Sequence, residues 1–234
     1  RLPCADTKGQ ARTMISGDGE RSWVAADRLG VYLAPAVVAA EDQRFFEHAG
    51  IDESEVAGVL AELEGAPRRG ASTITQQLAR TLFTGSERSA TRKLREVLYA
   101  VEMERTLGKA RILELYLNTV DWGPGLCGAR AAARAYFNKS PAQLTARESA
   151  WLAAILRNPH LAYQRRLEPG APERERAHWV LMQMREFPRS DRARWSREPL
   201  AFVVPKARTE TCRIDPTAAG CQPLAVARNL SRVK

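Results

Sequence analysis

The sequence predicts a mainly α-helical protein, and three observations carry this prediction. Apolar residues recur with helical spacing along most of the 234 residues, whereas the alternation typical of strands is scarce. Thr73 with Gln76, and Thr145 with Glu148, have the spacing of capping boxes, which mark helix starts. Glycines and an Asn-Pro pair follow the apolar runs, as is typical of helix ends. With 44% hydrophobic residues, the chain can fill a core of its own.

The first expected helix runs from Pro35 to about His48. Proline suits the first turn of a helix, because its missing N–H would have no partner there anyway. In such a helix Val37, Glu41 and Phe45 share one face, so the carboxylate of Glu41 lies within the hydrophobic stripe.

The next two helices are expected over residues 73–83 and 91–107. Thr73 is the predicted N-cap of the first, because an apolar run follows it directly. The inward stripe of the second is expected to consist of Leu94, Leu98 and Val101.

Further helices are expected over residues 109–118, 127–137, 145–156 and 173–187. Helical spacing assigns a buried set to the first of them, namely Ile112, Leu113, Tyr116 and Leu117. The pair Asn158-Pro159 is expected to end the third, because the residue before a proline avoids helical geometry.

The chain is expected to have three parts: an N-terminal segment at 1–29, a helical domain at 30–188 and a C-terminal extension at 189–234. The extension contains prolines, two cysteines, dispersed arginines and one strand-like run, Leu200 to Val204. We therefore expect a small, irregular appendage there.

The charge predicts an anionic partner. Lys and Arg number 36 and Asp and Glu 27, so the formal net charge is +9. Nucleic acid, anionic lipid headgroups and a pyrophosphate-bearing substrate would all fit this charge. Nucleic acid is the least favoured of them, because only 7% of the residues are aromatic and no recognition module is present.

The cysteines favour disulfides over a zinc site. No CxxC spacing occurs and the three histidines are scattered. Four cysteines are present, namely Cys4, Cys127, Cys212 and Cys221. Cys212 and Cys221 bracket a short loop and could pair in an oxidising compartment, but four cysteines allow three connectivities, and free thiols are the alternative.

No stretch approaches the length of an apolar membrane span. The sequence begins with Arg1 rather than Met, so we expect an N-terminal anchor or signal to have preceded it.

An acidic pair, Glu41-Asp42, lies inside an apolar and aromatic run. Burial disfavours the charged form of a carboxyl group and raises its pKa, which suits an acid or base catalyst near neutral pH. The alternative is a structural ion pair with Arg44 or another cation, which is the commoner case for such a segment taken alone.

Four blocks stand in order along the chain: AAEDQRFFEHAG at 39–50, GASTITQQLAR at 70–80, RKLREVLYAVEMERTLGKARILELYLN at 92–118 and GARAAARAYFNK at 128–139. Together they resemble the peptidoglycan glycosyltransferases, which polymerise lipid-linked disaccharide units into bacterial cell-wall glycan. The resemblance covers residues 30–188 and implies a lysozyme-like helical catalytic domain. The loop Asp121-Trp122-Gly123 is similar to that of the monofunctional branch, and no penicillin-binding domain is expected after it.

The resemblance implies two catalytic carboxylates. Glu41 matches the glutamate that deprotonates the acceptor sugar's 4-hydroxyl, whose oxygen then attacks C1 of the lipid-linked donor with inversion. Glu96 matches the second glutamate, and its cationic neighbours should keep it ionised so that it organises cations or a metal beside the leaving pyrophosphate. An ordinary helix pair with Arg92 is the alternative for Glu96.

The resemblance also implies a set of substrate-binding residues. Those on the sugar side are Asp42, His48, Ser72, Thr73, Gln76 and Gln77. Those expected to hold the donor's phosphates are Arg80, Arg88 and Lys93. Arg80 departs from the family, which has lysine there, so its contact is the least secure. Each of these residues has an alternative role. Helix capping explains Thr73 and Gln76 equally well, and a structural role is the commoner case for His48. Asp42 could instead orient Arg44 or His48, and solvated surface charge is the alternative for the cations.

The expected substrate is lipid II with its growing glycan, used at the outer, periplasmic face of the bacterial cytoplasmic membrane. A divalent cation, Mg²⁺ or Mn²⁺, is the one cofactor that the resemblance allows, and other cell-wall synthesis proteins are the partners it allows. A lytic enzyme that cleaves glycan and an inactive membrane-associated scaffold are the alternative functions.

Overall fold

The computed structural model describes residues 2–5, 11–14, 23–52, 72–85 and 89–203. Its helices are α1 (Leu33–Glu41), α3 (Ile74–Ala79), α4 (Ala90–Leu107), α5 (Lys109–Thr119), α6 (Ala129–Phe137), α7 (Ala146–Ile155), α8 (Pro159–Arg165), α9 (Pro172–Gln183) and α10 (Arg189–Trp195). Two short 3-10 turns cover Ala26–Arg28 and Pro141–Gln143, and a π-helical turn covers Arg80–Thr84. Strands β1 (Leu2–Ala5) and β2 (Ala11–Met14) pair antiparallel, with Leu2 opposite Met14. The mainly α fold class is therefore confirmed.

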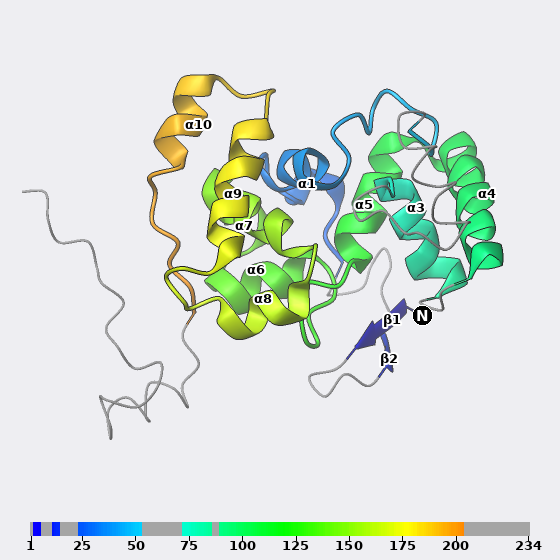
Figure 1. Cartoon of the computed structure of the whole chain (residues 1–234), viewed down its shortest axis with the longest axis horizontal. Coiled ribbons are helices and arrows are strands. Elements are labelled where there is room, and N and C mark those ends of the chain that lie inside the picture. The colour runs from blue at the N-terminus through cyan, green and yellow to red at the C-terminus, as the bar shows by residue number, and fades with distance from the viewer. Residues whose placement is uncertain (1, 6–10, 15–22, 53–71, 86–88, 204–234) are drawn as a thin grey trace, which may run out of the picture.

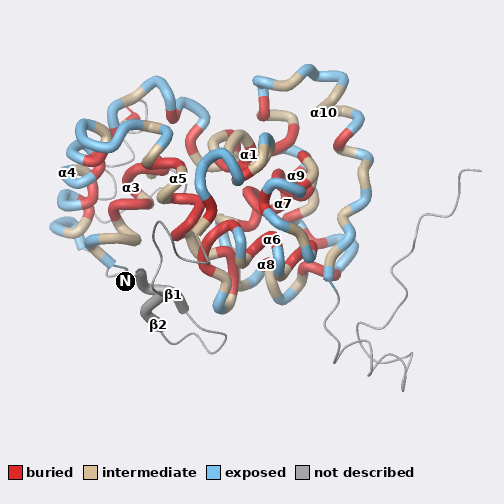
Figure 2. Tube along the Cα trace, turned by 180° about the vertical axis from the view of Figure 1, so that it is seen from behind, coloured by how far each residue is buried: buried red, intermediate tan, exposed pale blue. Residues whose placement is uncertain are grey.

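The helices form two groups on either side of α1 (Figure 1). Helices α3, α4 and α5 pack against one another, and α7 and α9 pack against each other and against α1. Buried positions run through α3, α5, α6 and α7, while the outer side of α4 is exposed (Figure 2). The C-terminal end of α1 thus lies where the two groups meet.

Helix α1 ends at Glu41, earlier than the predicted end near His48. The Asp42 backbone leaves the helix with φ −162° and ψ 77°, and its carboxylate accepts a hydrogen bond from the N–H of Ile74 instead. Phe45 is fully buried in the turns that follow rather than on the helix. The predicted helical face through Glu41 and Phe45 is therefore wrong, although both residues do lie inward.

Helix α4 begins one residue before its predicted start, but its faces are exchanged. Leu94, Leu98 and Val101 are exposed, so the predicted inward stripe is wrong. The stripe that faces inward consists of Lys93, Glu96, Ala100 and Met103. Apolar periodicity could not identify the buried face, because that face carries an ion pair and the leucines face outward.

The end of α7 is confirmed, and a further helix begins immediately after it. Thr145 accepts from the N–H of Glu148, and the Glu148 side chain accepts from the N–H of Thr145, so the predicted capping box is present. Asn158 accepts from the N–H of Leu161, and Pro159 occupies the first turn of α8. The Asn158-Pro159 pair therefore both ends one helix and starts the next.

The described part of the C-terminal extension packs on the domain. Trp195 of α10 contacts Tyr32 edge-on, with ring centroids 5.2 Å apart. Phe202 stacks on Phe137 at 5.3 Å and contacts Trp151 at 4.7 Å. The described residues of the expected strand, 200–203, have no regular secondary structure, although the N–H of Val203 donates to the Tyr136 carbonyl at 2.8 Å. The domain boundary at residue 188 stays a prediction, since residues 204–234 lie outside the described part.

Helix α6 begins two residues later than predicted because of Gly128. This glycine has φ +81°, and a Cβ there would meet the carbonyl oxygen of Asn118 at 2.6 Å. Such a backbone and such a close approach both require glycine. The preceding Cys127 is disulfide-bonded, as expected of these cysteines, whereas Cys212 and Cys221 lie outside the described residues.

Candidate active site

The carboxylate of Glu41 lies at the junction of the two helix groups. Its side chain is 14% exposed. Oε2 accepts a hydrogen bond from Nε2 of Gln77 on α3 at 3.1 Å, and Oε1 lies 3.7 Å from a guanidinium nitrogen of Arg176 on α9. The ion pair proposed as the alternative is not formed with Arg44, which pairs with Asp52 instead. Each carboxylate oxygen thus has one partner, and the two partners come from opposite sides of α1.

Burial raises the pKa of the Glu41 carboxyl. The hydrogen bond from Gln77 lowers this pKa, and the charges of Arg176, Arg157 and Arg80 lower it by smaller amounts. Desolvation outweighs them, so the pKa stays above its ordinary value. A carboxylate in this setting can accept a proton near neutral pH.

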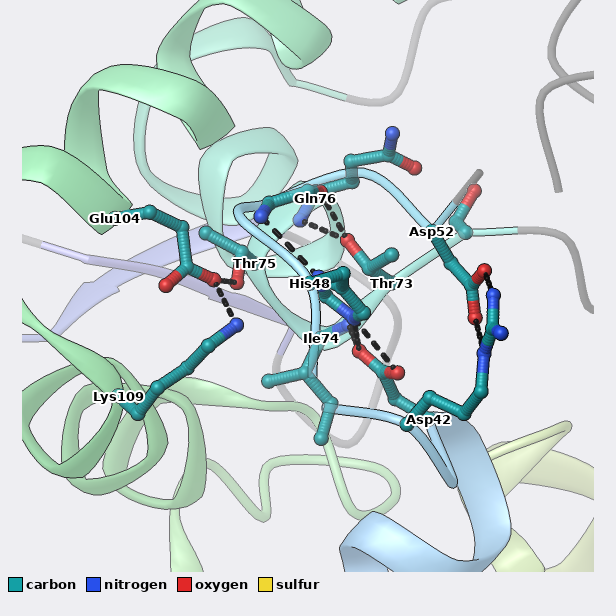
Figure 3. Close-up of polar contacts among 12 residues, drawn as sticks. Asp42, His48, Asp52, Thr73, Ile74, Thr75, Gln76, Glu104 and Lys109 are labelled. Carbon is teal, nitrogen blue, oxygen red and sulfur yellow. Dashed lines mark hydrogen bonds and ion pairs between the residues drawn. The ribbon is translucent and has the colours of Figure 1, made fainter. Parts of the chain in front are cut away.

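Asp42 and His48 form a buried pair that ties α1 to α3 (Figure 3). Nε2 of His48 lies 3.0 and 3.1 Å from the two Asp42 oxygens, and Nδ1 accepts from the N–H of Gly50 at 3.2 Å. Because Nδ1 accepts a bond, the proton of the neutral ring lies on Nε2 and is donated to Asp42. Burial raises the pKa of Asp42, and the His48 bond lowers it. Backbone N–H groups of Ile74 and Gly50 donate to Asp42 and His48, so the pair is held in place by the backbone.

Glu96 is buried between two cations of its own helix. Glu96 and Lys93 are each only 1% exposed, and Nζ of Lys93 lies 3.6 Å from Oε2 of Glu96. Arg92 binds Oε1 of the same carboxylate. Nζ of Lys93 also donates to the Ser72 hydroxyl at 2.9 Å and to Oε1 of Gln76 at 3.5 Å. This cation cluster, Arg92, Lys93 and Glu96, is compact and screened from water.

Two adjacent glutamines of α3 join the cation cluster to Glu41. Gln76 contacts Lys93, and Gln77 contacts Glu41. The Gln77 amide is also bonded on its other side, because its Oε1 accepts from the Tyr116 hydroxyl at 2.9 Å. The Nε2 group of Gln76 is buried and has no hydrogen-bond partner among the described residues. The Gln76 amide therefore has an N–H group without a partner among the described residues, while the Gln77 amide is hydrogen-bonded at both ends.

Thr73 serves the backbone in this structure. Its hydroxyl oxygen accepts from the N–H of Gln76 at 3.2 Å, which confirms it as the N-cap of α3, and it donates to the Gly50 carbonyl at 2.7 Å. Thr75 beside it donates to Glu104, which also binds Lys109 at 2.7 Å (Figure 3). These bonds fix the start of α3.

Arg80 begins the π-helical turn after α3, and its charge acts on both Glu41 and Tyr116. No salt bridge of Arg80 occurs within the described ranges. Arg88 lies outside the described residues, so its predicted contact with phosphate stays a prediction.

Two residues of the site escaped the sequence analysis. Arg176 lies on a helix far along the chain, and no local signal distinguishes it from the other arginines there. Tyr116 was expected only as a core residue, although a buried tyrosine usually needs a hydrogen-bond partner and could have been examined for one.

A shallow depression of about 330 Å³, largely open to solvent, lies beside Arg176. Its lining consists of Arg157, Pro172, Glu175, Arg176 and Trp179. Trp179 is 41% exposed, and the Arg176 guanidinium lies 5.5 Å from its ring centre. Such a volume with an indole and two guanidinium groups can accept a sugar with a polar substituent.

Comparisons with known proteins identify the family of this chain. The family model described as "Transglycosylase" matches residues 8–185. The biosynthetic peptidoglycan transglycosylase of Shewanella amazonensis is 46% identical over 167 residues, covering 70% of this chain and 67% of the relative. That of Aeromonas hydrophila is 44% identical over 167 residues and covers 70% of each chain. A solved structure of penicillin-binding protein 1A from Haemophilus influenzae aligns with 93% of this chain and 25% of that chain at 19% identity, and its TM-score of 0.46 is too low to bear on the site. On the family match and these relatives, the chain belongs to the transglycosylase family, which confirms the resemblance carried by the four sequence blocks.

Proposed function

We propose that this transglycosylase polymerises lipid II into β-1,4-linked glycan strands by an inverting transfer in which Glu41 is the general base. The Glu41 carboxylate takes the proton of the acceptor's 4-hydroxyl. The acceptor oxygen forms a bond to C1 of the donor while the bond from C1 to the pyrophosphate oxygen breaks. Polyprenyl pyrophosphate leaves with the electron pair, and no covalent enzyme intermediate is required.

The observation that carries this proposal is the contrast between the two glutamates of the site. Glu41 has an amide and one guanidinium at 3.7 Å as partners, whereas Glu96 has two cations, Arg92 in direct contact and Lys93 at 3.6 Å. A pair of carboxyl groups in such different environments is the pattern that separates a proton acceptor from a charge organiser. The family supplies the reaction class, and the geometry supports this division of roles.

The cation cluster is proposed to stabilise the leaving pyrophosphate. Lys93 is held by Ser72, Gln76 and Glu96, so its charge is in place before the reaction. Fixed charges in a site that excludes water stabilise a developing charge more than mobile ones in water. Nε2 of Gln76, which has no hydrogen-bond partner among the described residues, adds a neutral donor next to Lys93. Glu96 then acts by holding the two cations.

The surroundings of Glu96 do not fit a divalent cation. Its two oxygens are engaged by Arg92 and Lys93. Within the described ranges, no three or more carboxylate, histidine or cysteine side chains gather into a candidate metal site. The proposed transfer uses only the side chains described above, and a requirement for Mg²⁺ or Mn²⁺ stays a prediction.

The exposed face of α4 is proposed to lie on the membrane that carries the lipid substrate. The apolar side chains on this face and on the neighbouring π-helical turn are exposed, namely Phe83, Leu94, Leu98, Tyr99 and Val101. Phe83 and Tyr99 stack with ring centres 4.7 Å apart, so the patch is continuous across the two elements. A contiguous apolar patch of this kind marks an interaction surface. No described helix has the length and apolar character needed to cross a bilayer.

The same patch and the disulfide at Cys127 support the proposed location at the outer face of the cytoplasmic membrane. A disulfide persists in an oxidising compartment, and a lipid-linked substrate requires contact with the bilayer. The basic net charge of +9 adds attraction to anionic headgroups.

The decisive experiment measures polymer formed from labelled lipid II by the wild-type chain and by Glu41→Gln. Glutamine keeps the size of the side chain and removes its basicity, so turnover should fall by about 10²–10⁴-fold. Glu148→Gln is the matched control, because it changes another buried glutamate that binds Lys139 away from the site. Cleavage of preformed glycan without polymerisation would identify a lytic enzyme, and unchanged polymerisation by Glu41→Gln would refute the role of Glu41.

A further inference from the structure

The hydrogen bonds of the Gln77 side chain point to a residue that the four sequence blocks do not assign. Nε2 donates to Oε2 of Glu41 at 3.1 Å and to the Ser72 carbonyl at 3.2 Å, while Oε1 accepts from the Tyr116 hydroxyl at 2.9 Å. We propose that Tyr116 is a positioning residue that fixes the orientation of the Gln77 amide and thereby holds the Glu41 carboxylate for proton transfer. This inference rests on the proposed function of Glu41 as the general base.

An amide needs such a fixed partner because its two ends have nearly the same shape. A half-turn of the Gln77 amide would place Oε1 against the Glu41 carboxylate and the Ser72 carbonyl, both of which only accept hydrogen bonds. These two acceptors oppose that half-turn, and the bond that the Tyr116 hydroxyl donates to Oε1 would also be lost in it. Tyr116 is only 2% exposed, so solvent water has little room to take over the bond.

The Tyr116 hydroxyl stays protonated and donates its hydrogen bond to Gln77. Burial raises the pKa of its hydroxyl well above 10, and the nearby charge of Glu41 raises it further. The phenol therefore keeps its proton throughout the pH range in which the enzyme would work. It is a permanent hydrogen-bond donor to Oε1 and does not itself exchange a proton with substrate.

The same bonds change the role of Gln77. Both of its N–H groups are used, one on Glu41 and one on the Ser72 carbonyl, so in this arrangement it offers no donor to a sugar. The neighbouring Gln76 differs, because its Nε2 has no partner among the described residues. Gln77 therefore supports the base in this arrangement, and its role is not that of a direct sugar contact.

The effect of the Tyr116–Gln77–Glu41 hydrogen bonds on the pKa of Glu41 can be separated from the effect of the surrounding charges. We call these two hydrogen bonds the relay. Arg176 on α9, Arg157 after α7 and Arg80 after α3 all lower its pKa, and none of them is bonded to Tyr116. The neighbouring carboxyl of Asp42 is engaged by His48. Removing the Tyr116 hydroxyl therefore leaves these charges in place and weakens only the Gln77 hydrogen bond. Because that bond lowers the pKa of Glu41, its loss moves the pKa upward.

The test compares Tyr116→Phe with Tyr136→Phe. Tyr136 is the matched control, since it is also fully buried and its hydroxyl donates to the Trp122 carbonyl at 2.7 Å, outside the site. With lipid II as substrate, Tyr116→Phe should lower kcat about threefold to tenfold with little change in KM, as expected for one neutral hydrogen bond. The acid limb of its pH profile should move to higher pH, because Glu41 must be ionised to act. Tyr136→Phe should keep the wild-type kcat and acid limb.

A double-mutant cycle with Gln77→Met shows whether Tyr116 acts through Gln77. Methionine keeps the length of the side chain and removes the amide, so adding Tyr116→Phe to it should cost nothing further. Additive losses would overturn the relay. If Tyr116→Phe does not fold, Gln77→Met alone carries the test: a shifted acid limb with an unchanged KM supports the relay, and a raised KM with an unshifted limb overturns it.

A measurement without substrate separates the relay from the proposed function. In the full chain labelled with ¹³C-glutamate, the Glu41 carboxyl signal, assigned as the one missing in Glu41→Gln, should titrate at higher pH in Tyr116→Phe than in wild type. An unchanged titration would overturn the relay even if the enzyme polymerises lipid II. A wild-type chain that makes no polymer would overturn the proposed function while leaving this titration to decide on the Tyr116 contact.

Discussion

Replacing Glu96 should destabilise the protein more than replacing Lys93, although the two side chains form one buried cluster. In Lys93→Met, Glu96 keeps its contact with Arg92, so no charge is left alone. The expected cost is the lost bonds to Ser72, Gln76 and Glu96, about 1–3 kcal/mol. In Glu96→Gln, two buried cations lose their shared anion, which should cost about 3–5 kcal/mol.

Urea unfolding of both variants at pH 7 measures this difference directly. A loss of 3–5 kcal/mol corresponds to a melting temperature lower by roughly 6–20 °C for a chain of this size. Glu102→Gln is the control, because Glu102 pairs with Arg105 on the exposed side of the same helix. Equal stability of Glu96→Gln and Lys93→Met, or the reverse order, would refute the reading of Glu96 as the anion that two cations share.

The activity of the two variants should follow a different order from their stability. Lys93→Met removes a fixed charge aimed at the leaving group, and by analogy with one lost oxyanion donor kcat should fall about 10²–10³-fold. Polymerisation is measured well below the lower melting temperature, so that both proteins are folded. Full activity of Lys93→Met would remove the proposed role of the cation cluster in holding pyrophosphate.

Three further predictions concern other parts of the molecule. The rate should fall as the pH drops through the pKa of Glu41, which burial raises above 4.5, and a pH profile of kcat/KM whose acid limb lies below 4.5 would contradict a buried base. Leu98→Ser should weaken binding to anionic vesicles by about tenfold or more if the leucine enters the bilayer, whereas Leu161→Ser, at an exposed leucine on α8, should not, and equal effects in a flotation assay would argue against an α4 membrane face. Phe202→Ala should lower the free energy of unfolding by about 1–3 kcal/mol, because the ring stacks on Phe137 and meets Trp151 edge-on. An unchanged urea midpoint would show that these contacts add no stability.

Much of the helical fold could be predicted because its signals are local. Thr73 and Thr145 both cap the helices predicted to follow them, since an N-cap bond needs only residues within one turn. The full predicted capping box forms at Thr145 with Glu148, whereas at Thr73 only the bond from the N–H of Gln76 is present. The buried set of α5 followed from its spacing for the same reason. The end of α1 could not be predicted, because it depends on a bond from Ile74 to Asp42, more than thirty residues away in the sequence.

The two faces of α4 show a second limit. A helix with leucines on one side and an ion pair on the other reads as an ordinary amphipathic helix with its apolar side inward. Here Lys93 and Glu96 face inward and the leucines face outward. Periodicity measures how residues separate into faces, and only the tertiary structure shows which face a neighbour covers.

The candidate site was predictable only as far as the sequence blocks extend. They identify Glu41, Glu96, Lys93 and the two glutamines of α3, and the structure brings these residues together through that helix. Arg176 reaches Glu41 from α9, and no block marks it. Contacts between elements distant in the chain are therefore the part that sequence reasoning missed.

The adjacent glutamines of α3 have a mechanical consequence. Consecutive side chains of a helix point about 100° apart, so Gln76 and Gln77 face two different directions from one rigid axis. The directions in which α3 contacts Glu41 and Lys93 are then set by backbone geometry rather than by flexible side chains. A rotation of this short helix would move the Gln76 contact with Lys93 and the Gln77 contact with Glu41 together, so the relative position of the two contacts would be preserved.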